Sequence, residues 1–270
     1  MELQPERPPL PESSLREAVL RGSALWREMR VVAETGSSNA DVAAAARAGA
    51  AEGLIVVAEH QRAGRGRTGR SWSSPPRAGL AVSVLLRPAV PPTRLGWLPL
   101  LAGVALAESV HRETGLLARL KWPNDLLIGG RKCAGILAEA VGVQAVVVGI
   151  GLNVTLRADE LPIPEATSLA LAGARTTDRT RLLVALLAAI EAWYGRWRDA
   201  AGDPDASGLR PAYLRACATI GQRVRALLPD GTEPTGTATT VDPDGRLVLA
   251  LPAGPRAVAA GDITHLRPAD

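Results

Sequence analysis

The sequence of 270 residues predicts an α+β fold, with a mixed or antiparallel sheet packed against helices and a small C-terminal β-barrel. Two observations predict this class. Before residue 218, segments with helical spacing alternate with short strand-like segments that are close enough in sequence to pair antiparallel. After residue 218, only strand-like alternation occurs, which is typical of a small barrel. We therefore expect an N-terminal extension with a short helix at 1–29, a main domain at 30–217 and a barrel domain at 218–270.

The first half of the chain carries clear helix and strand signals. Residues 1–11 are rich in proline and predict a loose lead-in, after which Ser13 and Ser14 can cap a short helix. Pro99 is tolerated because it falls in the first turn of a long apolar helix. The elements expected here are a helix ending near residue 21, a strand at 30–34, a helix at 40–48, strands at 54–59 and 78–87, and a central buried helix at 95–114.

The second half changes to β-structure, then to helix, and back to β-structure. Gly129 and Gly130 predict a turn between two strands, and Asp178 is a suitable N-cap for a long amphipathic helix. Asp-Gly pairs at 230–231 and 244–245 predict turns between the last strands. The elements expected here are strands at 119–121, 126–128, 132–141 and 145–154, helices at 178–200 and 209–218, and strands at 222–228, 234–241, 246–251, 257–260 and 264–267.

The composition is that of a globular protein. Hydrophobic residues make up 47% of the chain and charged residues 21%, which excludes a disordered protein. Cys133 and Cys217 are far apart, so neither a disulfide framework nor a structural zinc site is expected. Residues 1–11 lack a signal-peptide pattern, and the longest apolar run, 95–107, is too short to cross a membrane, so a cytoplasmic protein is expected.

Residues 61–76 carry no helix or strand period and predict a long loop. The segment 64–69 matches the pattern G-x-G-x-x-G, but residues 71–76 cannot begin the helix that a dinucleotide-binding or P-loop site requires. Glycines allow a ligand to come close, and arginines bind phosphate or carboxylate oxygens. We therefore expect a loop that becomes ordered over a bound anion, with a solvated basic loop as the alternative. Its arginines are Arg62, Arg65, Arg67 and Arg70.

Lysine and asparagine are rare in this arginine-rich chain, so the few that remain are informative. Lys121 ends a predicted strand just before Trp122, and a lysine retained there indicates a compact positive charge, with a surface lysine as the alternative. The two lysines are Lys121 and Lys132, and the three asparagines are Asn39, Asn124 and Asn153.

Two further polar segments have both a functional and a structural explanation. Gly149 and Gly151 precede Asn153 at the end of an apolar strand, which indicates either close approach to a ligand or a bulged buried strand. Residues 35–39 form a polar turn that a helix cap alone would explain. His60, His111 and His265 have no partner at a useful spacing, and neither G-x-S-x-G nor H-E-x-x-H occurs, so hydrolase and metalloenzyme functions are excluded.

Three motifs stand in order along the chain. They are Glu34-Thr35-Gly36-Ser37-Ser38-Asn39, the segment 59–70 with its Gly-Arg-Gly-Arg core, and Lys121-Trp122-Pro123-Asn124-Asp125 followed by 130–137. Together they resemble the biotin–protein ligases (biotin–[acetyl-CoA-carboxylase] ligases), and the strand at 149–153 and the terminal barrel extend the resemblance over residues 30–268. Ser38 stands where the family commonly has Thr, and Arg62 where Gln or Thr is common.

The resemblance implies a catalytic domain similar to class II aminoacyl-tRNA synthetases, an SH3-like C-terminal domain and a two-step reaction. The biotin carboxylate attacks the α-phosphate of ATP to give biotinyl-5′-AMP and pyrophosphate. A lysine of a biotin carboxyl carrier domain, from acetyl-CoA carboxylase or a related carboxylase, then attacks the acyl carbon and releases AMP. Mg²⁺ is expected to be held mainly by the ATP phosphates, with no metal site on the protein.

Longer members of this family bind DNA through an N-terminal winged helix–turn–helix. About 29 residues precede the predicted catalytic domain here, so the resemblance implies a ligase without DNA or membrane binding, as a monomer or weak homodimer.

The resemblance also assigns the site. Lys121 and Arg65 are expected to be catalytic, because the first step joins two anions and needs cations between them. Biotin binding is assigned to Ser37, Ser38, Asn39, Gln61, Gly64, Arg65, Lys121, Gly135 and Gly149. ATP and adenylate binding is assigned to Arg65, Gly66, Arg67, Arg70, Trp72, Lys121, Asn124, Gly151 and Asn153. Loop 61–75 is expected to close over the adenylate and exclude water, with Trp72 covering the ligand.

Two alternative functions remain at this point. A lipoate–protein ligase or octanoyltransferase shares the same fold, although the Gly-Arg-Gly-Arg loop and the 121–125 motif favour biotin. A nucleic-acid-binding module could use the basic loop and the barrel. The loop contains a single aromatic residue and the net charge is only +4, so base stacking and phosphate binding would both be weak.

Overall fold

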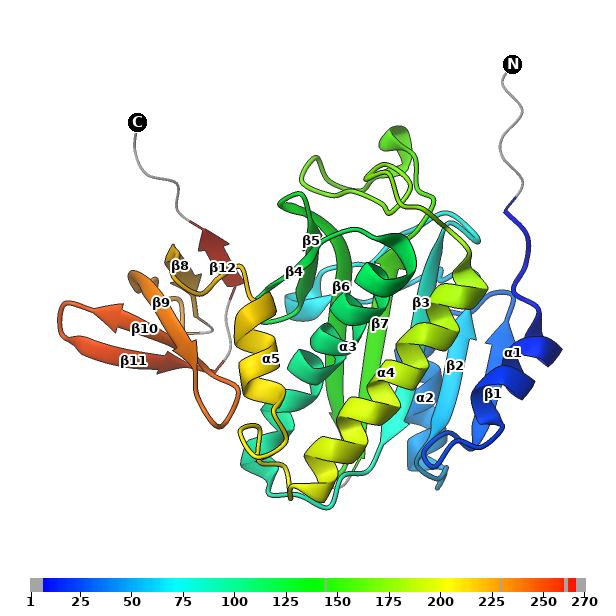
Figure 1. Ribbon diagram of the computed structural model, residues 1–270, viewed down its shortest axis with the longest axis horizontal. Coiled ribbons are helices and arrows are strands. Elements are labelled where there is room, and N and C mark those ends of the chain that lie inside the picture. Colours follow the sequence, from blue (N-terminus) through cyan, green and yellow to red (C-terminus); the bar gives the residue numbers. More distant parts are fainter. Residues whose placement is uncertain (1–6, 144, 229, 260–261, 266–270) are drawn as a thin grey trace.

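The computed structural model describes residues 7–143, 145–228, 230–259 and 262–265. Figure 1 shows a central sheet with helices packed on it and a second sheet beside one end of the first. The α+β fold class is therefore confirmed. Among the described residues, none of the helices combines the length and the hydropathy needed to cross a bilayer.

Within the described residues, seven strands form the main sheet. They are β1 (Glu28–Val32), β2 (Leu54–Ala58), β3 (Gly79–Leu86), β4 (Ala118–Lys121), β5 (Asp125–Ile128), β6 (Arg131–Val141) and β7 (Ala145–Asn153). Their spatial order is β1-β2-β3-β7-β6-β5-β4, in which β1 pairs parallel with β2 and the other neighbours pair antiparallel. The long strands β3, β7 and β6 thus lie side by side in the middle of the sheet.

Helices cover both faces of this sheet. They are α1 (Glu12–Leu20), α2 (Ser38–Arg47), α3 (Trp97–Thr114), α4 (Arg179–Asp199) and α5 (Leu209–Ala216). Ile55 and Val57 of β2 belong to the core that contains α3 and α4, whereas Leu54 and Val56 belong to a second core that contains α2. Successive side chains of a strand point to opposite faces, so α2 lies on the face opposite α3 and α4.

A second antiparallel sheet follows the helices. Its described strands are β8 (Arg223–Leu227), β9 (Thr235–Val241), β10 (Leu247–Leu251), β11 (Gly254–Val258) and β12 (Asp262–His265), in the order β11-β10-β9-β8-β12. The predicted barrel is thus a five-stranded sheet in the described residues, with β11 and β12 at its edges. The last two strands were placed two to three residues too late, and 266–267 of the predicted final strand lie outside the described residues.

The C-terminal sheet is attached to the main sheet through the turn at 242–246, between β9 and β10. The indole of Trp97 donates a hydrogen bond to Pro243 O (2.9 Å), and the indole of Trp122 donates one to Gly245 O (3.1 Å). Both indole rings are buried. This turn therefore contacts the start of α3 and the residue that follows Lys121.

Four local predictions need correction. The first strand is Glu28–Val32 rather than 30–34, and α2 begins at Ser38 rather than at residue 40. The N-cap of α1 is Pro11, so Ser13 and Ser14 lie inside the first turn. The described part of the lead-in, 7–11, is not loose. The Leu10 amide donates to Glu59 Oε1, and Arg179 donates both to Glu59 Oε2 and to Pro8 O. A buried ion pair therefore fixes this segment to the main domain.

Candidate functional site

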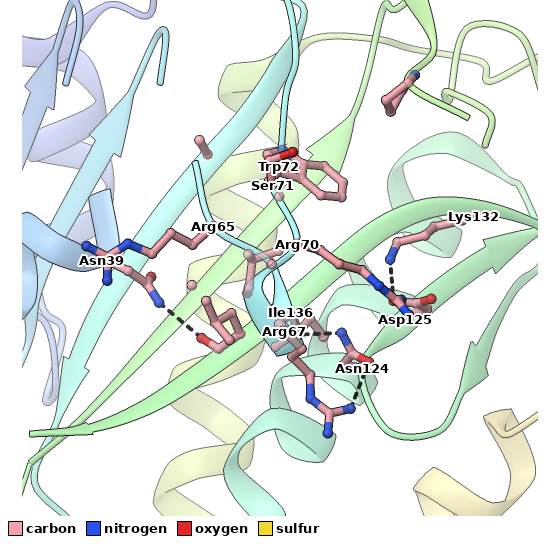
Figure 2. A pocket seen from close by; sticks show the side chains of 18 of the residues that line it. Asn39, Arg65, Arg67, Arg70, Ser71, Trp72, Asn124, Asp125, Lys132 and Ile136 are labelled. Carbon is pink, nitrogen blue, oxygen red and sulfur yellow. Dashed lines mark hydrogen bonds and ion pairs between the residues drawn. The ribbon is translucent and has the colours of Figure 1, made fainter. Parts of the chain in front are cut away.

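A cavity of about 740 Å³ lies over the middle strands of the main sheet, beneath the glycine- and arginine-rich loop (Figure 2). It brings together segments that are more than 100 residues apart in sequence. The predicted site residues that line it are Ser37, Ser38, Asn39, Gln61, Arg65, Gly66, Arg67, Arg70, Trp72, Lys121, Asn124, Gly135, Gly149, Gly151 and Asn153. Gly64 does not line the cavity.

The loop folds back on itself over the cavity. The Trp72 amide donates to Gly64 O (2.8 Å), the Gly66 amide donates to Arg70 O (2.6 Å), and a 3₁₀ turn at Arg67–Gly69 reverses the chain. Gly64 is buried, and a Cβ there would overlap the Trp72 carbonyl oxygen. Gly64 therefore closes the base of the loop, and its assignment to biotin binding stays a prediction.

The indole of Trp72 lies on two glycines of the cavity floor. Gly135 of β6 and Gly151 of β7 are opposite each other in the sheet. A Cβ at Gly151 would overlap the Trp72 ring, and one at Gly135 would come within 3.1 Å of it. The two glycines thus create the flat surface on which the ring rests. Trp72 belongs to the loop that was expected to close over the ligand, and its ring lies on the floor of the cavity.

A buried polar network forms one end of the cavity. Ser38 Oγ is within 2.9 Å of Gln61 Oε1 and 2.7 Å of Ser83 Oγ, and the Ser83 hydroxyl donates to Asn39 Oδ1 (2.6 Å). Asn39 Nδ2 in turn donates to Glu139 Oε2 (2.7 Å). Each group orients the next, so the network presents fixed donors and acceptors to the cavity.

Gly149 and Ser37 complete this end of the cavity. A Cβ at Gly149 would overlap Asn39 Oδ1, so glycine is required for the Asn39 side chain to reach Ser83. Ser37 occupies the N-cap position of α2, but its hydroxyl makes no capping hydrogen bond to any described residue. The alternative explanation of Ser37 as a helix cap therefore loses its support.

Basic side chains surround the other end. Arg67 Nη1 donates to Asn124 Oδ1 (3.3 Å), and Asn124 Nδ2 donates to Ile136 O (3.2 Å), as drawn in Figure 2. Arg65 is exposed and extends from the loop toward the polar network instead, with Nη1 3.9 Å from Glu139 Oε1 (Figure 2). Lys121 is the last residue of β4, and its backbone lies opposite that of Asp125 in the neighbouring strand β5. Positive charge is thus supplied from two sides, the loop and the strand end.

Four residues escaped the sequence prediction. Ser83 and Glu139 belong to the polar network, and an ion pair joins Lys132 Nζ to Asp125 Oδ1 (2.7 Å) inside the cavity. Asp125 Oδ1 is buried, and in the described part of the chain no group meets the geometry of a hydrogen bond to it. The ammonium group of Lys132 therefore acts on this oxygen as a neighbouring opposite charge. One signal was available for Lys132, which is one of only two lysines in the chain. A polar Ser83 in an apolar strand was a second signal.

Asn153 and Cys133 lie at the edge of the site. Asn153 is buried and its Nδ2 donates to Thr167 O (3.0 Å), so its donor is engaged by the backbone. Burial raises the pKa of the Cys133 thiol to about 12, and neither cysteine is among the described residues that line the cavity. A cysteine nucleophile is therefore not part of this site.

Comparison with known proteins first identifies the class of enzyme to which the chain is similar. The model of the biotin/lipoate A/B protein ligase family matches residues 41–153, and that of the biotin protein ligase C-terminal domain matches residues 219–266. The chain is 45% identical over 270 residues to the biotin–[acetyl-CoA-carboxylase] ligase of Mycobacterium tuberculosis, with 97% of each chain covered.

Two further comparisons agree. The bifunctional ligase/repressor BirA of Bacillus spizizenii is 35% identical over 221 residues, with 79% of this chain and 66% of that protein covered. The structure of biotin protein ligase from Aquifex aeolicus in complex with biotin and ATP superposes with a TM-score of 0.74 at 25% identity, over 90% of this chain and all of that one. The chain therefore belongs to the biotin protein ligase family.

Proposed function

We propose that this protein activates biotin with ATP to biotinyl-5′-AMP and then transfers biotin to a lysine of a carboxyl carrier domain. The observation that carries the proposal is a cavity with a network of hydroxyl and amide groups at one end and the basic side chains of Arg67 and Lys121 at the other. Biotin has the same division, because its ureido ring is neutral and polar whereas its carboxylate must meet a phosphate.

The polar network suits the ureido ring. Its N–H and C=O groups need matched acceptors and donors once water is removed. Ser37, Ser38 and Gln61 supply hydroxyl and amide groups to the cavity, and Asn39 and Ser83 fix the orientation of this cluster from behind. We assign biotin recognition to this end of the cavity. The role of Gly149 is to leave space for the Asn39 side chain.

The basic end suits the chemistry of the first step. Two anions approach each other when the biotin carboxylate attacks the α-phosphate, and cations fixed beforehand reduce the repulsion. Lys121 would contact both groups, and Arg65 and Arg67 would contact the phosphates from the loop. Arg67 is held by Asn124 at 3.3 Å, so part of the arrangement exists before ATP binds. Arg65 and Lys121 are the residues that we propose to be catalytic.

The adenylate would lie between the loop and the floor of the cavity. Arg70, Trp72, Gly66 and Asn153 line this region, and closure of loop 61–75 would exclude water from a hydrolysis-prone mixed anhydride. Among the described residues, no group of three or more His, Cys, Asp or Glu side chains is placed to hold a metal ion. We propose that Mg²⁺ enters with ATP, because Mg²⁺ prefers oxygen ligands and is commonly bound through the phosphates of a substrate.

The remaining proposals concern the whole chain. The two sheets support a boundary near residue 218, between a catalytic domain proposed at 30–217 and a C-terminal domain proposed at 218–270. The proposed limit of the extension at 1–29 falls inside β1. We propose a carrier domain of acetyl-CoA carboxylase or a related carboxylase as partner, a monomer or weak homodimer as the active form, and the cytoplasm, where ATP is supplied, as the compartment.

A transfer assay tests the proposed function. The protein, a carrier domain, biotin, ATP and Mg²⁺ are incubated, and the mass of the carrier is measured. We expect one biotin on one carrier lysine. A carrier with that lysine changed to arginine is the control, and lipoate in place of biotin tests specificity. Lipoylation without biotinylation, or no acylation at all, would overturn the proposal.

A further inference from the structure

A buried ion pair lies at the base of loop 61–75, and the proposed reaction gives it no role. Glu59 directly follows β2 and comes two residues before Gln61, whereas Arg179 is the first residue of α4. Arg179 Nη1 lies 2.5 Å from Glu59 Oε2, and both side chains are only 7% exposed. Burying two charges costs hydration energy that their attraction often fails to recover, so stability alone does not explain the pair.

The ion pair holds the chain on both sides of the loop. Before the loop, Glu59 is itself fixed to the end of β1, because its amide donates to Val32 O (2.9 Å). After the loop, Arg179 Nη1 donates to Gly79 O (3.3 Å). The Arg77 amide also donates to Glu59 O (2.8 Å). The two ends of the loop are therefore joined to each other and to α4 through these two residues.

The N-terminal segment supplies the remaining hydrogen bonds to the pair. The Leu10 amide donates to Glu59 Oε1, and Arg179 Nη2 donates to Pro8 O, each at 2.5 Å. Arg77 has a φ of 61°, a left-handed conformation that residues other than glycine keep only where their surroundings fix it. The base of the loop is therefore held in one defined conformation.

A fixed base determines where the loop places its site residues. Gln61 Oε1 accepts from the Ser38 amide (2.8 Å) and lies within 2.9 Å of the Ser38 hydroxyl, at the end of the cavity assigned to biotin. Arg65 and Arg67 follow in the same loop and are assigned to the phosphates. Reacting groups must be aligned closely, since a displacement of about 1 Å can lower a rate by about 100-fold.

We propose that Glu59 and Arg179 are positioning residues, which fix the base of loop 61–75 and thereby align Gln61 for biotin and the loop arginines for ATP. Neither side chain is among the described residues that line the cavity, so both act through the loop. The effect on the reaction rests on the proposed function, whereas the effect on the loop can be measured without substrates.

The test removes both charges together. Glu59→Gln/Arg179→Met leaves no unpaired charge in the interior, so this variant is expected to fold. The carbonyl groups of Gly79 and Pro8 lose their donor, which releases the base of the loop. We expect KM for biotin and the rate of trypsin cleavage within the loop each to rise about tenfold, the effect on an equilibrium of losing one hydrogen bond to a buried group. Pyrophosphate release gives KM, and fragment masses without substrates give the cleavage rate.

Tyr194→Phe is the matched control. The Tyr194 hydroxyl donates to Glu52 Oε1 (2.6 Å), which also accepts from the Arg87 amide (2.7 Å). This cluster joins α4 to the opposite ends of β2 and β3 from those that the ion pair holds. We expect Tyr194→Phe to lose stability with no change in KM for biotin or in loop cleavage, whereas a merely structural role of the ion pair predicts the same result for both variants.

The outcomes separate the two proposals. A wild-type KM for biotin or a wild-type rate of loop cleavage in Glu59→Gln/Arg179→Met would overturn the inference, and so would equal changes in Tyr194→Phe. If the double variant does not fold, Arg179→Lys makes the same comparison, because lysine keeps the charge but lacks the planar fork that reaches Glu59 and Pro8 together. A wild-type protein that neither binds biotin nor releases pyrophosphate would overturn the proposed function, and the rate of loop cleavage would still decide the role of the ion pair.

Discussion

Lys121 and Arg65 carry the charge neutralisation in the proposed first step, and each is predicted to be essential for rate. Lys121→Ala or Arg65→Ala should slow biotinyl-5′-AMP formation by roughly two to three powers of ten, the effect of losing one preorganised charge partner of a transition state. Pyrophosphate release measures the rate. Arg62→Ala is the matched control, because Arg62 is 69% exposed, pairs with Glu34 and does not line the cavity. Wild-type rates in Lys121→Ala and Arg65→Ala would contradict their assignment.

Gly149 tests whether the polar network must keep its geometry. A Cβ in Gly149→Ala would overlap Asn39 Oδ1 and displace it from Ser83. We expect a loss of about 1–3 kcal/mol in the free energy of unfolding and weaker biotin binding, measured by urea titration and calorimetry. Gly195→Ala is the control. Gly195 lies inside α4 with nothing near the added methyl group, so a gain of about 0.5–1 kcal/mol is expected there. Equal behaviour of the two variants would contradict the role of Gly149.

Residues of the site could be predicted from the sequence where their residue type is rare in this chain. All five lysines and asparagines of the chain line the cavity, and four of them were assigned from the sequence. Ser83 and Glu139 were not found, because serine and glutamate are ordinary strand residues. Their importance comes from contacts with Asn39, which is 44 and 100 residues away in sequence. A pattern within one segment carries no information about such contacts.

Among the elements, loop 61–75 makes the most direct prediction. Arg62, Arg65 and Arg70 are exposed in the structure, and apart from a 3₁₀ turn the loop contains no helix or strand. Trypsin should therefore cleave within the loop when no ligand is present. Biotin plus ATP should slow this cleavage, because closure over the adenylate buries the same peptide bonds. Fragment masses over time provide the measurement, with cleavage after Arg196 in α4 as an internal control. Equal loop cleavage with and without ligands would contradict closure.

The sequence predicted most elements, and the errors have local causes. The helix at 95–114 was recognised from its apolar spacing, and the structure places Pro99 in the first turn of α3 as expected. The lead-in was misjudged, because its order comes from a buried ion pair between Glu59 and Arg179, 120 residues apart. The start of α2 was placed too late, since its first turn is held by Gln61, whose Oε1 accepts from the Ser38 amide (2.8 Å).

At the scale of the whole molecule, Trp122 couples the C-terminal sheet to the site. Trp122→Phe removes the donor to Gly245 O, leaves that buried oxygen unpaired, and should cost about 1–3 kcal/mol of stability. Because Lys121 precedes this residue, kcat/KM for ATP should also fall, by up to roughly 100-fold if the lysine is displaced. Trp193→Phe is the control. Trp193 on α4 also loses an indole hydrogen bond, to Glu108, but it does not line the cavity. We expect a smaller loss of stability in Trp193→Phe, because Glu108 is exposed, and a kinetic change in Trp122→Phe alone. Equal kinetics in both variants would count against the coupling.

Glu160 ties the N-terminal segment to the wall of the cavity, and it gives the fold a predictable dependence on pH. Its carboxylate accepts from Arg7 (2.6 and 3.3 Å) and from the Arg157 amide, and the segment that follows supplies Pro162 and Ile163 to the cavity. Burial opposes ionisation, but the hydrogen bonds and charges of Arg7 and Arg157 outweigh it, so the pKa of Glu160 lies below its usual value.

A carboxyl whose pKa is lowered by folding contributes stability that is complete above its unfolded pKa of about 4.3 and is lost as the pH falls through its folded pKa. Glu160→Gln removes that contribution. At pH 7 we expect the variant to be less stable than the wild type by up to about 1 kcal/mol, the usual range for an ion pair with access to solvent. The difference should decrease steadily as the pH is lowered below about 4.3. Urea unfolding of both proteins from pH 7 to pH 3 measures it. A difference that stays constant over this range would show that the Glu160 charge does not stabilise the fold, and that the segment is held by packing instead.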